Sequence, residues 1–440
     1  MPTDVFDCSI IYRKCLADHH TDKLISAMNH NSTDRDKIGL VIIMCFAQVL
    51  VQIGAFFWPA LLPDLMQLWK LSNSEAGWVT AVFYGAYLVS VPILVTLTDR
   101  LDPKSVYLFG VSAVVAGHLG FGLYADGFWS AICARTLTGV GWAGTYMTGL
   151  KLLADHVDAR TLSRATAGHA ASIGAAGAFS FATGDLIASF AGWQTAFIIA
   201  SASALVALIV VILIVPFRSK PITNSGNARK LYDFRPVLKN RSAMAYSIAY
   251  AIHTLEMSAI RGWAVAFLSY VAISTGDDNQ FLSPAIVVTT LGLIGTVASV
   301  SGNEIAIRFG RRKLIMAAML ASIAIAAGIG FIGSMSYTLA TILLVIYGIV
   351  IWLDSSSLTA GSAGTADPSR RGQTLAVHSM MGYTGGFIGP LLIGWTLDLA
   401  GGMSGNSWGI AFMTIAALTT IALIIFWRLR PKELEGDKNS

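Results

Sequence analysis

Seven polar side chains that could bind a small molecule or carry a proton lie inside stretches that are otherwise apolar. They are Gln48, Gln52, Arg135, His253, Glu256, Arg261 and Asp354. A charge is expensive to place in hydrocarbon, so such side chains usually face a cavity or a partner. We therefore treat these seven residues as the candidate site for substrate and proton binding.

Three of them, His253, Glu256 and Arg261, share one predicted helix. At about 100° per residue they fall within an arc of roughly 140°, so they can form one polar face. Burial favours the neutral form of a carboxylic acid, and Glu256 is therefore a candidate for proton exchange near neutral pH. The alternative is a structural ion pair of Glu256 with Arg261 or Arg135. His253 is either a member of a proton relay or a buried histidine bonded to a neighbouring hydroxyl group.

The two arginines favour an anionic ligand. A guanidinium group suits a carboxylate, and two arginines against one central acid, Glu256, leave the site positive. The sequence therefore predicts a small organic anion, such as a carboxylate. Two alternatives stay open: Arg135 can extend to the membrane surface, and Asp354 can either balance an arginine or be a solvated acid at a helix end. Aromatic residues that could line the pocket are Phe56, Phe57, Trp58, Tyr84, Tyr87, Trp142, Tyr146, Trp263 and Trp352.

The elements that carry these residues are predicted to be membrane-spanning helices. The 440-residue chain is 55% hydrophobic and 12% charged, with a mean hydropathy of +0.64, whereas soluble domains carry about 25% charged residues. A spanning helix needs about 20 mainly apolar residues. Twelve such runs are found, at 38–62, 76–98, 105–124, 128–152, 164–188, 194–215, 244–271, 285–305, 313–333, 337–358, 374–397 and 407–427. The fifth and eleventh are rich in Gly and Ser, which predicts that they pack against protein.

The Lys and Arg residues predict the orientation. Apart from Lys70, Arg135 and Arg261, all of them lie in the tails or at loops on one side of the twelve runs. Positive residues are retained on the cytoplasmic side, so both termini are expected in the cytoplasm. This asymmetry also explains the net charge of +5 without a nucleic-acid partner.

The longest loop divides the chain into two halves. We expect a cytoplasmic tail, six helices, a cytoplasmic linker, six helices and a second cytoplasmic tail, at 1–37, 38–215, 216–243, 244–427 and 428–440. The halves show a weak repeat: one constant offset aligns Arg100 with Arg308 and the glycine pair of the fifth run with that of the eleventh. Internal repeats are typical of secondary transporters, which bind their substrate between the repeats.

Short motifs in these runs resemble those of the major facilitator superfamily, over about 38–430. The family's loop signature, Gly-x-Leu-x-Asp-Arg-x-Gly-Arg-Arg/Lys, is matched after the second run by Leu97, Asp99, Arg100 and Lys104, and after the eighth by Arg308, Gly310, Arg311 and Arg312. The first copy departs from it at Val95, Asp102 and Pro103, and the second at Ile307. Similar family motifs are Arg135-x-x-x-Gly139-x-Gly141 in the fourth run and Gly385-Gly386-x-x-Gly389-Pro390 in the eleventh.

The resemblance implies an all-α membrane protein with 12 transmembrane helices in two pseudo-symmetric six-helix bundles. It implies alternating access around a cavity lined by helices 1, 4, 7 and 10, which are the runs that carry the seven candidate residues. It also implies gating by the two loop motifs, through Asp99, Arg100, Arg308, Gly310 and Arg311, with Asp99 bracing the closed cytoplasmic side. The alternative is that Asp99 and Arg100 only end a helix in water.

We therefore predict a secondary transporter, a proton-coupled symporter for a small organic anion in a bacterial inner membrane. We expect it to act as a monomer, with the proton gradient as its driving force and no cofactor or bound metal. The sequence has no metal-ligand cluster, phosphate loop or catalytic arrangement, so we do not expect an enzyme. Two other hypotheses stay open: a proton-driven exporter of drugs or metabolites, and a non-transporting sensor on the same fold.

Overall fold

The fold was obtained as a computed structural model that describes residues 37–217, 234–276, 281–434 and 437, except for the side chains of 159, 160 and 163. These residues contain helices and no strand. The first half is made of an unlabelled helix, Lys37–Gln52, and α2 (Phe57–Ala60), α3 (Leu62–Trp69), α4 (Asn73–Leu97), α5 (Pro103–Tyr124), α6 (Phe128–Ala143), α7 (Tyr146–His156), α8 (Ala159–Ala191) and α9 (Trp193–Ile214).

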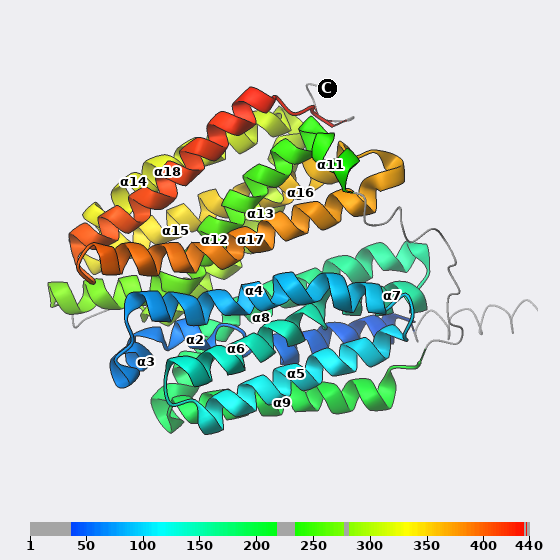
Figure 1. The fold of residues 1–440 in the computed structure, drawn as a ribbon, viewed down its shortest axis with the longest axis horizontal. Coiled ribbons are helices and arrows are strands. Elements are labelled where there is room, and N and C mark those ends of the chain that lie inside the picture. The colour runs from blue at the N-terminus through cyan, green and yellow to red at the C-terminus, as the bar shows by residue number, and fades with distance from the viewer. Residues whose placement is uncertain (1–36, 218–233, 277–280, 435–436, 438–440) are drawn as a thin grey trace, which may run out of the picture.

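The second half repeats this order after the linker. Its helices are α11 (Arg235–Lys239), α12 (Arg241–Thr275), α13 (Pro284–Phe309), α14 (Arg311–Gly333), α15 (Tyr337–Leu353), α16 (Ser355–Gly364), the short 3-10 helix η1 (Pro368–Arg370), α17 (Arg371–Leu399) and α18 (Gly405–Leu429). Figure 1 shows the halves as two bundles, one above the other, with α4 and α17 lying side by side between them.

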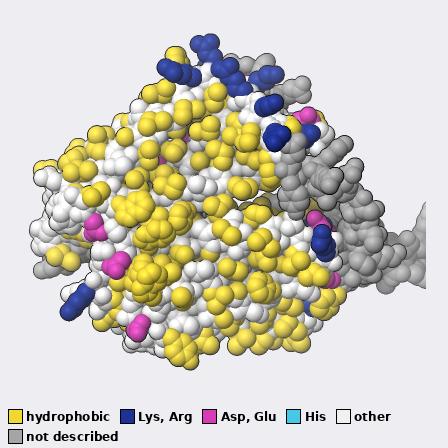
Figure 2. Space-filling model, viewed as in Figure 1, with side chains coloured by type: hydrophobic (Ala, Val, Ile, Leu, Met, Phe, Trp, Pro, Cys, Tyr) yellow, Lys and Arg dark blue, Asp and Glu magenta, His cyan; other side chains and the backbone are white. Residues whose placement is uncertain are grey.

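The helices are suited to a bilayer. Nine in the described part of the chain are long and apolar enough to cross a membrane. Many of their large apolar side chains are exposed, including Val89 (67%) and Leu213 (76%), and such a surface needs lipid around it. Figure 2 shows apolar groups over much of one face and Lys and Arg side chains gathered at its upper edge. We call the end of the bundles that carries the Lys- and Arg-rich loops the basic end, and the other the opposite end.

Three of the twelve predicted runs are interrupted helices. The first is broken between Gln52 and Phe57, the fourth at Gly144 and the tenth at Asp354. These are three of the four helices that the family resemblance places around the cavity, and the fourth, α12, is continuous. Interrupted helices free backbone groups for binding, and they mark the substrate sites of many transporters.

Small residues determine how closely α12 and α17 approach. Gly385 in α17 lies against the backbone carbonyl of Ala251, and an added Cβ would also come within 2.8 Å of the Thr254 hydroxyl. That hydroxyl already donates a hydrogen bond of 2.6 Å to the carbonyl of Gly382. Because backbone atoms cannot move aside as a side chain can, this contact requires a residue without a Cβ.

Gly385→Ala is therefore expected to lower the unfolding temperature by several degrees, through forced separation of α12 and α17. Gly372→Ala is the matched control, because Gly372 lies in the same helix and an added Cβ there has nothing within 4 Å. It should be neutral or slightly stabilising, since alanine is the better helix former. Thermal unfolding of the two purified variants tests this packing, and equal melting temperatures would contradict it.

Candidate functional site

The halves meet along two pairs of helices, α4 with α17 and α8 with α13. In the first pair, Tyr87 stacks on Tyr383 with ring centroids 3.8 Å apart, and Trp78 packs against Trp395 at 6.3 Å. In the second, the backbone N–H of Ala182 donates to the Thr289 hydroxyl at 3.0 Å. These contacts lie between the opposite end and the middle of the bundles, so the halves are closed together at the opposite end.

The carboxylate of Asp398 joins the two halves at the opposite end. The two oxygens of Asp398, near the end of α17, accept hydrogen bonds from the backbone N–H groups of Asn73 (3.1 Å) and Ser74 (2.7 Å) and from the Asn73 side-chain amide (2.8 Å). Asn73 and Ser74 begin α4, so an acid of the second half caps a helix of the first. The positive end of the α4 dipole strengthens this contact.

We expect Asp398→Asn to open the opposite end for a larger share of the time, because the loss of charge weakens three hydrogen bonds between the halves. Spin labels at the exposed residues Tyr124 and Met335 (75% exposed each) would report it, in a background with all four cysteines replaced by serine. Pulsed electron spin resonance should show longer distances in Asp398→Asn and an unchanged distribution in the exposed-acid control Asp64→Asn. An unchanged Asp398→Asn distribution would show that the contact does not hold the halves.

Arg135 binds a backbone carbonyl group at the break in the first helix. Pro59 has no N–H group, so the carbonyl oxygen of Ala55, four residues earlier, has no helical partner. Nη1 of Arg135 donates to this oxygen at 2.9 Å, and the guanidinium group lies 4.4 Å above the Phe83 ring. The side chain is 1% exposed, and its Nε has no partner. Arg135 therefore stays inside the protein and stabilises the interrupted helix.

Arg261 lies between the halves and is only partly buried. Its guanidinium carbon is 5.3 Å from the ring of Phe56 in the first half and 5.2 Å from that of Trp352 in the second. No carboxylate within the described residues forms an ion pair with it. The hydroxyl of Tyr84, which is 3% exposed, lies close enough to Arg261 to interact with it.

Aromatic rings surround this point. Trp142 stacks on Phe83 at 4.9 Å and lies 6.2 Å from Tyr84 and 4.8 Å from Tyr87. Among the described residues, the indole N–H of Trp142 and the hydroxyls of Tyr84 and Tyr87 are buried and make no hydrogen bond of ordinary geometry. Tyr84 lies beside Arg261, and Tyr87 lies beside Tyr383. Buried polar groups are normally paired, so these donors, of which Tyr84 lies beside Arg261, are available to a ligand.

Glu256 lies inside the second half rather than between the halves. Its Oε1 accepts hydrogen bonds from the hydroxyls of Ser322 (2.6 Å), Thr419 (2.8 Å) and Tyr347 (3.3 Å), which come from α14, α18 and α15. Neither ion pair that the sequence allowed, with Arg135 or with Arg261, is formed in the described part of the protein. The carboxyl group is 4% exposed and is held by hydroxyl groups alone.

The remaining candidates are divided between the two bundles. His253 and Asp354 face each other, with Nδ1 3.0 Å from Oδ1, and both are buried. Asp354 occupies the break between α15 and α16, so it is not a solvated acid. Gln48 is buried in the first bundle, where its Oε1 lies 3.5 Å from the Tyr107 hydroxyl. Gln52 is buried at the end of the first helix, just before the break.

The two loop motifs have different environments. Asp99, Arg100 and Arg308 are exposed at the basic end. Gly310 has φ +99°, which favours glycine, and caps α14. Arg311 is 2% exposed.

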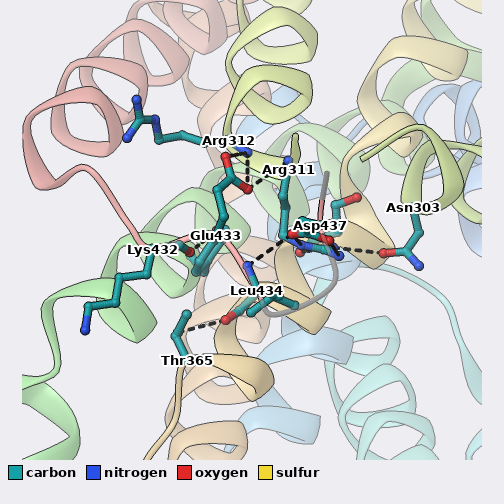
Figure 3. Close-up of polar contacts among 11 residues, drawn as sticks. Asn303, Arg311, Arg312, Thr365, Lys432, Glu433, Leu434 and Asp437 are labelled. Atoms are coloured by element: carbon teal, nitrogen blue, oxygen red, sulfur yellow. Dashed lines mark hydrogen bonds and ion pairs between the residues drawn. The ribbon is translucent and has the colours of Figure 1, made fainter. Parts of the chain in front are cut away.

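Arg311 connects three segments of the second half at the basic end (Figure 3). Its Nε and Nη2 donate to the Asp437 carboxylate at 3.1 and 3.2 Å, and its Nη1 donates to the Asn303 side chain at 2.9 Å and to the Ser357 carbonyl at 3.2 Å. Glu433 accepts from the backbone N–H groups of Arg311 and Arg312 at 2.9 and 3.1 Å. The motif is thus fastened to the C-terminal segment.

Comparison with known proteins gives the family. The sequence model of the Major Facilitator Superfamily matches residues 44–360 and 286–440. This chain belongs to the Major Facilitator Superfamily. The predicted resemblance and the all-helical membrane fold are thereby confirmed.

Similar facilitators include several transporters. The human protein spinster homolog 1 is 24% identical over 289 residues, 62% of this chain and 54% of the relative, so the match spans about half of that protein. The sphingosine-1-phosphate transporter SPNS2 of Xenopus tropicalis is 22% identical over 385 residues, 81% of this chain and 73% of the relative. The crystal structure of a bacterial homologue of the human lysosomal transporter Spinster, inward-facing and occupied, has a TM-score of 0.72 at 14% identity, covering 89% of this chain and 96% of that one.

Three contributions to the site were not predicted. Pro59 explains the contact of Arg135, and a proline inside the first apolar run was a visible signal for the break. Asp398 was not singled out, because its partners lie more than 300 residues away and no local pattern marks it. The hydroxyls of Ser322 and Thr419 could be assigned to Glu256 only when the packing of the second bundle was known.

Proposed function

We propose that this facilitator is a secondary active transporter that moves a small organic anion by alternating access, and that Arg261 binds the acid group of the anion between the two halves. The main support for this proposal is the guanidinium group of Arg261. It is partly exposed, contacts rings of both halves and has no carboxylate partner among the described residues. A ligand at this position would touch both moving bodies, which alternating access requires.

The charges near the site support an anion. Two acids lie on the helix of Arg261 or on a neighbouring helix, and both contact other groups. Asp354 lies beside His253, and Glu256 accepts hydrogen bonds from three hydroxyl groups. Among the described residues, no carboxylate forms an ion pair with Arg135. A planar guanidinium group binds carboxylate or phosphate oxygens through two parallel hydrogen bonds.

The rings around Arg261 support an anion with an apolar or aromatic body. Phe56, Trp352 and Trp142 offer ring faces, and the buried hydroxyl groups of Tyr84 and Tyr87 offer polar contacts beside them. One relative's name describes it as a transporter of sphingosine-1-phosphate, which joins an acidic group to an apolar chain. An anion of this general kind fits the site proposed here.

We further propose that transport is coupled to protons through the second half. The His253–Asp354 pair lies at the break in the tenth run, and Glu256 lies on the same helix as His253. Protonation of this cluster would alter the contacts that fix the broken helix. The substrate would then move with protons, as a symporter does, and no other cofactor takes part.

We place the basic end in the cytoplasm of a bacterial cell, with the protein in the inner membrane and both termini inside. The concentration of Lys and Arg at one end supports this orientation. We expect the monomer to be the functional unit, because the site lies between the halves of one chain, and we expect no nucleic-acid partner.

The aromatic lining also favours a second candidate, a proton-driven exporter of apolar cations or neutral compounds. A thermal-shift screen of the purified protein separates the two. The probes are octanoate, 1-naphthoate and dodecyl phosphate, with octylammonium and naphthylmethylammonium as cations of matched size. Binding stabilises the folded state by about 2.7 kcal/mol at a hundredfold excess over Kd. Stabilisation by the anions alone supports the anion transporter, and stabilisation by the cations alone supports the exporter.

A further inference from the structure

A second site of a different kind lies at the basic end, outside the region between the halves. A cavity of about 610 Å³ opens there between the start of α12 and the end of α18. It is lined by Arg241, Ser242, Trp427, Arg428, Leu429, Arg430 and Lys432. Four of these seven residues are basic and none is acidic. We call this cavity the basic pocket.

Backbone contacts hold the four cations in one place. Arg430 ends α18 in the left-handed conformation, with φ 46°, and turns the chain back over α12. Nη2 of Arg241 then donates to the carbonyl of Arg428 at 2.7 Å, and the backbone N–H of Lys432 donates to the Ser242 hydroxyl at 3.1 Å. The hydroxyl of Tyr246 donates to the Lys432 carbonyl at 2.9 Å. Like charges would move apart in a free tail. These contacts therefore fix the four positive side chains close to one another.

The two acids of the same segment that the structure describes, Glu433 and Asp437, point away from the basic pocket. Glu433 turns toward the first N–H groups of α14, and Asp437 toward Arg311 (Figure 3). In the described part of the chain, no carboxylate forms an ion pair with Arg241 or with the three cations after Trp427. Within the described residues, the positive charge of the basic pocket is therefore not balanced by an acid.

The position of the basic pocket indicates a lipid. Ile421, Ile424 and Trp427 form an exposed stripe along α18, with 54%, 46% and 53% of their surfaces accessible. The stripe faces where hydrocarbon would be, and its last residue is a tryptophan, which prefers the level of the lipid headgroups. A phosphate in the basic pocket would thus stand directly above acyl chains lying on the stripe.

We propose that the basic pocket binds the phosphate headgroup of an anionic phospholipid, with the acyl chains along the exposed stripe of α18. Clusters of Arg and Lys beside a spanning helix on the cytoplasmic side are suited to such headgroups. The site is independent of the transport substrate, because its residues lie at the outer edge of the second half.

The test uses the full-length protein in mixed micelles and follows thermal unfolding during titration with phosphatidylglycerol. The double variant Arg428→Gln, Arg430→Gln should bind this lipid about tenfold or more weakly than the unchanged protein. The double variant Lys313→Gln, Arg371→Gln removes the same charge from exposed positions at the same end and should bind normally. Lys432→Gln, whose side chain makes none of the backbone contacts, serves as a second variant if the first is unstable, and should also bind more weakly.

Three outcomes would overturn the proposal. Equal weakening in the pocket and control variants would mean that only the total charge matters. Equal stabilisation by phosphatidylcholine would mean that the headgroup charge does not matter. Stabilisation by inorganic phosphate or glycerol 3-phosphate as strong as that by phosphatidylglycerol would identify the basic pocket as a site for soluble phosphates.

Discussion

Arg261→Gln is expected to weaken binding of the stabilising anion about 10- to 150-fold. This range corresponds to about 1.5–3 kcal/mol for hydrogen bonds to a charged group. Arg261 has no carboxylate partner among the described residues and contacts rings of both halves, so its removal takes away the charge that a ligand would neutralise. Titration calorimetry with the best anion of the thermal-shift screen measures the loss directly.

Two further variants make the result specific. Arg261→Lys keeps the charge but loses the planar fork, and should recover only part of the affinity. Lys313→Gln removes one positive charge from an exposed position at the start of α14 and should bind the anion normally. If Arg261→Gln binds as tightly as Lys313→Gln, the anion does not bind at Arg261.

Asp354→Asn is expected to abolish uphill transport while leaving exchange intact. The carboxylate lies 3.0 Å from His253 at the break between α15 and α16, and asparagine has a similar shape but takes up no proton. A proton gradient drives accumulation only if the protonated and unprotonated proteins differ in their conformational preference. Without that difference, the ratio of internal to external anion should fall to about one.

Proteoliposomes loaded with the anion test the two activities separately. Counterflow of labelled anion should persist in Asp354→Asn, and accumulation driven by an imposed pH gradient should disappear. His253→Gln should behave in the same way, and Asp64→Asn, which alters an exposed acid in α3, should accumulate normally. Full accumulation by Asp354→Asn would remove the His253–Asp354 pair from the coupling mechanism.

The sequence predicted which helices carry the polar residues better than it predicted where those residues point. His253, Glu256 and Arg261 do share α12. At about 100° per residue, Glu256 and Arg261 lie at the two edges of the predicted arc, about 140° apart. In the fold this angle separates them: Arg261 contacts Phe56 of the first half, and Glu256 contacts Ser322 inside the second. Because α12 packs against helices of both halves, one edge of its polar face is buried in the second half and the other edge lies between the halves.

Other features depend on contacts that no local pattern contains. The carbonyl that Arg135 binds is free because of Pro59, and this local cause could have been found in the sequence. The partners of Asp398 and of Asp437 come from distant helices, so they follow from the packing of the bundles alone. The C-terminal tail was predicted only as a cytoplasmic segment. In the fold, Glu433 and Asp437 bind the second loop motif, and three cations of the tail line a pocket.

A structure of the protein with the most stabilising anion bound would locate the substrate. We expect density for the acid group beside the guanidinium of Arg261, with the apolar body of the ligand among Trp142, Tyr84 and Trp352. Density for the anion inside the second bundle beside His253, or only in the basic pocket, would contradict the claim that the substrate binds between the halves.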